Sequence, residues 1–526
     1  MKISKTLLVG LMVVGFAGAA SASVTTLCIA GSTAFRGSVI KAIQDSLAPG
    51  YTYAFDGTGT QTQFNAGQAT YSGSIKTGLT GAGESIIVKT YWTGSVAGVC
   101  DVSTTNPIIG FIPTSALPST GGSNVHGLYT KESNVPNVAM SDASAAADAE
   151  SVATAAFGSI DGSVYQADIT NAGLVDAGST GTNKAGTAKT VGMLPFVWVA
   201  GAETSGSTPP YTNMTQQAAS TLESQGYIPA SMLSGTAFTT STNDFVFLIG
   251  RNEDSGTRVN AQAEAAIGVT TAVSSFGLSM NQYYAVFTAN NGSVATSGSF
   301  PSDDVYAQSN AGLGITAGSP IGNIETGGTN CTLVDIGLWP ADAPVNTETS
   351  INWDTEGHSG QAGGSGVAGV LDAVNPVVGL NLTLIDNGGG KPTSPIAWNH
   401  SVSKAYLVGY LGTADAGGIP STAGCTYLTF NGVPYSPANV YNGSYSFWGF
   451  EHMYYRGTGT NSPTGAQLDM TTDIADTIFS TDAPTDSSGN TDTAIPPTNV
   501  KVGGLIFNST VTNFTRGSEG LPVTLN

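Results

Sequence analysis

The chain has 526 residues, of which 40% are hydrophobic, only 10% are charged and 69 are glycine. Its formal net charge is −20, and only 16 residues are basic. Nucleic-acid binding is excluded, because a phosphate backbone is held by clustered Lys and Arg and the chain has no such cluster. The 6 Trp, 19 Tyr and 19 Phe are spread along the whole length, unlike a disordered chain. We therefore expect a folded, loop-rich protein.

The N-terminus predicts a secretory signal peptide over residues 1–22. Lys2 and Lys5 precede the apolar run Leu7–Ala20, and Ala20, Ser21 and Ala22 fit the small-x-small cleavage rule. A retained anchor helix is the alternative, although the apolar run is short for one. No later stretch approaches the ~20 apolar residues that a membrane-spanning helix needs. We expect a mature chain that begins near Ser23 and is periplasmic or secreted.

Four cysteines remain in the expected mature chain: Cys28, Cys100, Cys331 and Cys425. An even number in an exported protein permits two disulfides, with three possible pairings. Buried free thiols are the alternative. The spacing matches no zinc-binding pattern, so we expect no metal.

Three segments of the first third of the chain are each typical of a strand, a polar turn and a helix. The run 24–30 is β-branched and apolar, precedes Gly31, Ser32 and Thr33, and leads to a helical pattern over 34–47. A second strand is expected at 86–92, followed by a polar turn at 93–98 that contains Ser95. A third unit joins 137–144, with Asp142, to an Ala-rich helix over 145–156. Such turns place backbone N–H groups at the positive end of a helix dipole, where anions bind.

The fourth unit contains the most specific signal in the sequence. A strand at 244–251 ends in Arg251, Ser255, Gly256 and Thr257 follow, and 258–267 is helical in pattern. The chain has only five arginines, and two of them flank this Ser-Gly-Thr. A buried tetrahedral oxyanion requires N–H and hydroxyl donors and is well matched by a planar guanidinium. The alternative for Arg251 is a surface salt bridge to Glu253 or Asp254.

In this order, the four turns resemble the ligand loops of periplasmic phosphate-binding proteins, the substrate-binding subunits of ABC importers. The resemblance implies an α/β, two-lobed type II periplasmic-binding-protein-like fold with large loop and β insertions. Lobe I would comprise 23–190 plus 441–526, and lobe II 191–440, with a first crossing strand at 191–200. The glycine-tyrosine strand at 405–411 and the segment 441–448 also resemble that family.

Carried over by position, the resemblance assigns eight ligand-binding residues. They are Ser32, Thr33, Ser95, Asp142, Arg251, Ser255, Gly256 and Thr257. It implies phosphate or a related oxyanion as ligand, an ABC permease as membrane partner, no cofactor and a monomer. Thr58, Gly59 and Thr60 compete with Ser95 for the second loop.

Asp142 bears on which oxyanion is bound. A carboxylate buried beside an anion is costly unless the ligand brings a proton, so Asp142 would favour phosphate over sulfate. The other interpretation is a helix N-cap, since an Asp before an Ala-rich helix suits that role.

Two further function classes remain open. The insertions and the Gly/Ser/Thr bias also fit an exported surface or matrix protein that uses the binding fold for adhesion or structure. A secreted hydrolase acting on phosphate esters is the third candidate. The sequence has neither a Gly-x-Ser-x-Gly elbow nor a His-Glu-x-x-His motif, so we expect no enzyme.

Overall fold

The computed structural model describes the greater part of the chain. The described residues are 24–57, 61–104, 109–152, 168–177, 190–201, 209–235, 244–252, 254–270, 361, 363–372, 404–419, 424–479, 514–516 and 519–522, with short strands at 276–278, 298–299, 320–321, 333–335, 383–385, 395–397 and 524–525. The predicted signal peptide, the Thr58–Thr60 turn, Glu253 and Cys331 lie outside these ranges.

The fold is α/β, as predicted, and is organised around one 13-stranded mixed sheet. Its first half consists of β1 (Thr25–Gly31), β2 (Thr52–Asp56), β3 (Gln68–Ser74), β4 (Ser85–Tyr91), β6 (Gly122–Asn124) and β8 (Val138–Ser141). In this half β1 lies between β4 and β8 and is parallel to both. Antiparallel pairing of β2 with β3 and of β3 with β4 extends the sheet outward.

Helices cover both faces of this half. On one face α1 (Arg36–Ser46) and α13 (Ala466–Phe479) share a core with Leu27 and Ile29 of β1. On the other, α2 (Ser95–Ser103) and α3 (Ala145–Val152) pack with Ala139 of β8. The alternation follows from the two-residue period of a strand, which sends neighbouring side chains to opposite faces.

The second half of the sheet contains β12 (Tyr227–Pro229), β13 (Asp244–Ile249) and β20 (Lys404–Gly412). Strands β13 and β20 are parallel, so their carboxyl ends lie at one edge. The helices of this half are α5 (Gln216–Gln225), α6 (Ser231–Ser234), α7 (Gly256–Glu264), α10 (Gly364–Asp372), α11 (Thr413–Ala416) and α12 (Pro437–Tyr441). Two pairs of short strands form small sheets of their own: β5 (Ile109–Phe111) with β7 (Glu132–Asn134), and β11 (Asn213–Met214) with β22 (Thr429–Phe430). Two further short strands join the large sheet: β9 (Leu174–Asp176), which pairs with β23, and β21 (Thr426–Tyr427), which pairs with β10.

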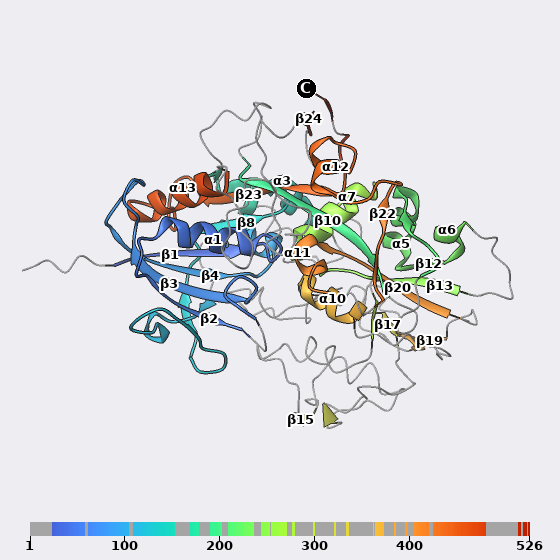
Figure 1. Ribbon diagram of the computed structural model, residues 1–526, viewed down its shortest axis with the longest axis horizontal. Coiled ribbons are helices and arrows are strands. Elements are labelled where there is room, and N and C mark those ends of the chain that lie inside the picture. The colour runs from blue at the N-terminus through green and yellow to red at the C-terminus, as the bar shows by residue number, and fades with distance from the viewer. Residues whose placement is uncertain are drawn as a thin grey trace, which may run out of the picture.

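Two long strands connect the halves, as Figure 1 shows. Strand β10 (Gly192–Ala200) pairs with β23 through 192–195 and with β20 through 196–200. Strand β23 (Trp448–Arg456) pairs with β10 through 448–451 and with β8 through 452–455. Each strand therefore changes partner midway. We call β10 and β23 the hinge strands, because among the described strands they alone continue the sheet from one half into the other.

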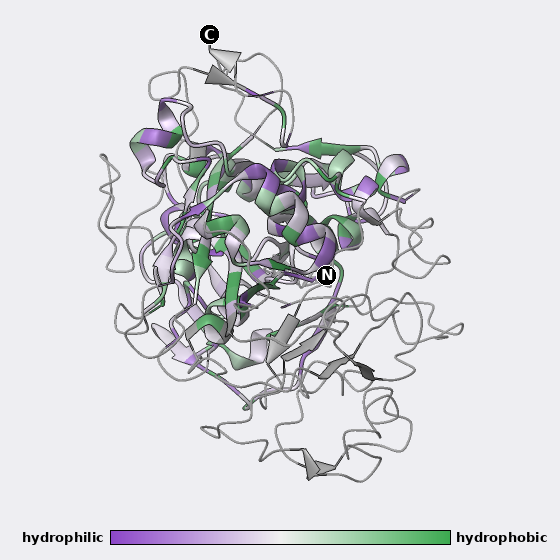
Figure 2. Ribbon diagram, turned by 90° about the vertical axis from the view of Figure 1, so that its right-hand side faces the viewer, coloured by the Kyte–Doolittle hydropathy of each residue, from purple (hydrophilic) through white to green (hydrophobic). Residues whose placement is uncertain are grey.

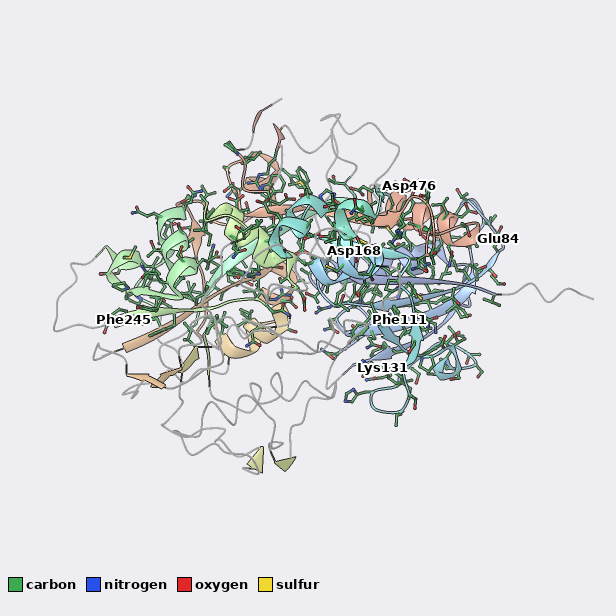
Figure 3. The ribbon with its side chains drawn as sticks, turned by 180° about the vertical axis from the view of Figure 1, so that it is seen from behind. Glu84, Phe111, Lys131, Asp168, Phe245 and Asp476 are labelled. Carbon is green, nitrogen blue, oxygen red and sulfur yellow. The ribbon has the colours of Figure 1, made fainter. Side chains whose placement is uncertain are left out.

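Hydrophobic residues concentrate in the central strands, whereas the outward helix faces are hydrophilic (Figure 2). All nine residues of β10 are buried, which is the burial pattern of a strand covered on both faces. Seen from behind, Phe245 of β13 and Phe111 of β5 lie on opposite sides of the molecule, one in each half (Figure 3).

The four strand-turn-helix units predicted from sequence are present, with small shifts at their ends. The one wrong element is the polar turn expected at 93–98, because α2 already begins at Ser95. Gly94 has φ +115°, a conformation that other residues rarely adopt, and this reverses the chain within one residue. The strand expected at 191–200 is β10, and that at 405–411 is β20.

The cysteines correct the prediction of two disulfides. Cys28 and Cys100 are both free thiols, so the four cysteines cannot form two disulfides. Cys28 and Cys100 are buried, on β1 and α2. Burial raises the pKa of Cys28 to about 12, so this thiol is not a nucleophile at neutral pH.

Carboxyl groups are buried where β23 changes partner. Glu451 is fully buried, and neither of its carboxyl oxygens has a hydrogen-bond partner within the described ranges. Burial and the nearby Asp142, Asp148 and Asp176 raise its pKa well above 4.5. Burial likewise raises the pKa of Asp148 well above its ordinary value, although Ser141 donates to it at 2.8 Å. Burial therefore favours the neutral form of both acids.

We expect stability to fall as pH rises, because these acids bind more protons when folded than when unfolded. The loss begins near the ordinary glutamate pKa of 4.5. It amounts to at most about 1.4 kcal/mol per pH unit for each carboxyl. Glu451→Gln removes one titrating group, so the free energy of unfolding should depend less steeply on pH. Urea denaturation between pH 5 and 9 measures the slope. The exposed Glu150→Gln on α3 is the control, and an unchanged slope in Glu451→Gln would contradict the expectation.

Candidate functional site

The first three predicted loops meet at one edge of the sheet, because β1, β4 and β8 are parallel and end there. Ser32 follows β1, Ser95 follows β4 and Asp142 follows β8. Gly31 makes this convergence possible. It has φ +116°, and a Cβ there would lie 2.1 Å from the Met140 carbonyl oxygen. The close approach lets the Ser32 N–H donate to that oxygen at 2.8 Å.

The second half supplies the fourth loop from the carboxyl end of β13. Arg251 lies two residues after the strand, and α7 begins at Gly256. Ser255 is the N-cap of α7, and its hydroxyl accepts a hydrogen bond from the Arg258 N–H at 3.3 Å. This cap fixes the start of the helix and so the position of Gly256 and Thr257.

Arg251 is buried, with only 2% of its surface exposed, and its guanidinium faces the first half. Its Nη2 donates to Thr33 Oγ1 and its Nη1 to Thr257 Oγ1, each at 3.4 Å, while Nε donates to the Gln361 carbonyl oxygen at 3.0 Å. Arg251 is therefore not a surface residue, and Glu253, one of its two alternative partners, lies outside the described residues. Burial lowers the pKa of Arg251, and Asp142 and Asp415 oppose that shift. An arginine keeps its charge in proteins, so the site contains a fixed cation.

Asp142 faces Arg251 from the first half and is also buried. Its Oδ2 accepts from Thr257 Oγ1 at 3.1 Å, whereas Oδ1 is buried with no hydrogen-bond partner among the described residues. Burial raises the pKa of Asp142, and the charge of Arg251 opposes the rise. The N-cap interpretation is wrong, because the Ser144 hydroxyl accepts from the Ala147 N–H at 3.3 Å and fills that role.

The hydroxyl groups of the first half are oriented by N–H donors. Ser32 Oγ accepts from the Phe35 N–H at 3.1 Å, and Ser95 Oγ accepts from the Asp142 N–H at 3.3 Å. Thr33 Oγ1 accepts from Arg251. A hydroxyl that accepts in this way keeps its own hydrogen for donation. The three side chains therefore present donors, the groups that an oxyanion binds.

Three helices also begin at this point: α1, α2 and α7. The partial positive charge of each N-terminus is directed to the same region. The structure thus brings together all eight of the predicted residues, with one guanidinium, several hydroxyls and three helix N-termini around one buried carboxyl. Such a set can hold a small tetrahedral anion without any metal.

The two halves touch directly across the site. The Val96 N–H donates to the Asp254 carbonyl oxygen at 3.0 Å. Gly256 also approaches the first half closely, because a Cβ there would lie 2.6 Å from Ser95 Oγ and 2.7 Å from Asp142 Oδ1. Only a glycine fits this approach between the start of α7 and the first half.

Sequence reasoning missed four residues that support the site. Asn260 donates to the carbonyl oxygens of Asp142 at 2.6 Å and of Gly256 at 2.9 Å. Its position one helical turn after Gly256 was a usable signal. Arg36 donates to the Thr33 carbonyl oxygen and pairs with Asp415 at 3.3 Å, and as one of five arginines it too was visible. Nothing near Gln361 or Asp415 in the sequence indicates their roles.

Comparisons with known proteins give only distant likenesses. No protein-family model matches the chain, and no curated protein matches it. A putative phosphate ABC transporter substrate-binding protein with bound phosphate from Clostridium perfringens is 10% identical over 86% of this chain and 92% of its own, with a TM-score of 0.33. An ABC-type phosphate transport receptor from Vibrio cholerae is 8% identical over 86% and 93%, with a TM-score of 0.31. Overlaps this loose identify no ligand, and the chemistry follows from the site's own residues.

Gly256→Ala should keep the two halves apart. The added methyl group would clash with Ser95 and Asp142, which belong to the other half, while the interior of each half is untouched. We expect a larger radius of gyration by small-angle X-ray scattering with a nearly unchanged thermal midpoint. Gly67→Ala is the matched control, since a Cβ there meets nothing within 4 Å. An unchanged radius in Gly256→Ala would show that the contact is not tight.

Proposed function

We propose that this protein is an exported solute-binding protein that holds a small oxyanion, with phosphate as the ligand, between the two halves of its sheet. The observation that carries the proposal is the buried Arg251, whose guanidinium faces Thr33 of one half and Thr257 of the other. A cation that is buried between hydroxyl donors, in a chain with only 16 basic residues, is costly unless it has a function. Closure around an anion offsets that cost.

Asp142 supports phosphate over sulfate. Its Oδ1 is buried without a hydrogen-bond partner among the described residues, and the charge of Arg251 opposes the rise in pKa that burial causes. A monohydrogen phosphate ligand can donate a hydrogen bond to such an oxygen, whereas sulfate has no proton at neutral pH. Sulfate would place two unshielded negative charges together, and this repulsion is the physical basis of the discrimination.

The same proposal includes delivery of the ligand to an ABC permease. Within the described parts of the chain, no helix combines the length and the apolar character needed to cross a membrane. A monomer with lobe I at 23–190 plus 441–526 and lobe II at 191–440, exported by the segment 1–22, would carry out this role. The two hinge strands give the lobes a connection about which to open and close.

Arg251→Lys should weaken phosphate binding by roughly a hundredfold, because a lysine keeps the charge but loses the planar fork that serves both halves. Isothermal titration calorimetry of the purified mature protein with phosphate, arsenate, sulfate and molybdate measures the affinities. Arg456→Lys, away from the site, is the control. If the wild-type protein bound none of these anions, or if Arg251→Lys bound phosphate as tightly, the proposal would fail.

Asp142→Asn should change selectivity more than overall binding. The amide removes the negative charge that repels sulfate, so the ratio of phosphate to sulfate affinity should fall by roughly tenfold or more. Competition titrations of phosphate against sulfate at pH 7.5 give the ratio. Asp45→Asn, on the surface of α1 in an ion pair with Lys41, is the control. A selectivity ratio equal to that of the wild type would remove Asp142 from the recognition of the ligand.

A further inference from the structure

A short segment near the C-terminus contacts both halves of the structure close to the candidate site. We call Arg516, Glu519, Gly520 and Leu521 the C-terminal strap. Glu519 holds the first half: its Oε1 accepts from the Ser144 N–H at 2.8 Å and its Oε2 from the Ser144 hydroxyl at 3.1 Å. Ser144 is two residues after Asp142 and caps α3. The carboxylate therefore fixes the turn that carries Asp142.

Arg516 holds the second half and a hinge strand. It forms an ion pair with Glu264, the last residue of α7, whose first residue is Gly256. It donates to the carbonyl oxygens of Trp448 at 2.7 Å and Ser446 at 2.9 Å, and its guanidinium lies 4.3 Å from the centre of the Trp448 ring. The side chain is 2% exposed. Arg516 therefore joins the far end of α7 to the start of β23.

The two anchors act as one unit. Arg516 Nε donates to the Leu521 carbonyl oxygen at 2.9 Å, which folds the strap onto itself. Directly after Glu519, Gly520 has φ +69° and lies so close to α7 that a Cβ would be 2.4 Å from the Ala263 carbonyl oxygen. Glu519 and Arg516 are thus held together, while each forms polar contacts with a different half.

We propose that Glu519 and Arg516 are positioning residues for ligand binding: the C-terminal strap ties the Asp142 turn to α7 and stabilises the arrangement in which the two halves meet. This inference rests on the proposed oxyanion-binding function. Because the strap stabilises the closed arrangement rather than contacting the ligand, its loss accelerates dissociation of the ligand. The association rate, which depends on access to the open site, changes little.

The proposal predicts a change in anion affinity of the opposite sign to the one that electrostatics alone predicts. Glu519 lies close enough to Asp148 and His452 to raise the pKa of each, so its charge reaches the region of Asp142. Removing a negative charge near an anion should by Coulomb attraction alone increase anion affinity. The strap predicts the opposite, a decrease.

The experiment measures inorganic phosphate binding by the mature protein with Glu519→Gln, Glu519→Ala, Arg516→Lys and the double variant Glu519→Ala/Arg516→Lys. We expect Glu519→Ala to weaken phosphate binding roughly fivefold or more, through the dissociation rate in stopped flow. The double variant should bind phosphate as tightly as the single variant that binds it less tightly, because release of either anchor frees the strap. Glu150→Gln, exposed on α3, controls for loss of charge. Equal or tighter binding by Glu519→Ala, or fully additive effects in the double variant, would overturn the proposal.

A second measurement separates this proposal from the proposed function. If the wild-type protein binds no oxyanion, the function fails, and the strap is then tested by small-angle X-ray scattering without ligand. Glu519→Ala should give a larger radius of gyration than the wild type and Glu150→Gln. If Glu519→Ala does not fold, as judged by circular dichroism, Glu519→Gln weakens the same contact more gently, because its amide keeps one acceptor oxygen and loses the charge. An unchanged radius of gyration in these variants would overturn the proposed role of the strap.

Discussion

The pairing of β10 with β23 over four residues of each strand is the constraint on which the rest of the structure depends. Because both strands change partner at that point, the loop after β4 meets the loop after β13, where the Val96 N–H donates to the Asp254 carbonyl oxygen. The hinge also forms the floor of the site. A Cβ at Gly449 of β23 would lie 2.5 Å from both the Asp142 carbonyl oxygen and Asn260 Oδ1, so one glycine lets components from both halves meet over the hinge.

The placement of β23 connects the hinge strands directly to the candidate site. Glu451 and His452 are consecutive residues at the change of partner, paired with Gly192 of β10 and Ser141 of β8. Asp142 immediately follows Ser141. The turn that carries Asp142 is therefore joined to the change of partner with no intervening loop.

Local patterns in the sequence were enough to locate the site but not to explain how it is assembled. Apolar β-branched runs followed by Gly, Ser and Thr predict a strand and a helix start within a few residues, and the scarcity of arginine singled out Arg251. The partners of those residues are distant: Gln361 is 110 residues from Arg251, and Asp415 is 379 residues from Arg36. Such pairs depend on the order β8-β23-β10, which inserts a strand from the end of the chain between two earlier ones. No local period encodes that order. Glu519 and Arg516 were missed for the same reason.

A net charge of −20 is compatible with capture of an anion, because the field at the site is local. Surface charges beyond a Debye length of about 8 Å are largely screened at physiological salt. Inside the closed site the effective dielectric constant is lower, so Arg251, the hydroxyls and the three helix N-termini dominate. Burial raises the pKa of Asp148 and of Glu451 well above their ordinary values, which lowers the negative charge near that region. Burial of these two acids thus limits the repulsion that they would exert on an anion beside Arg251.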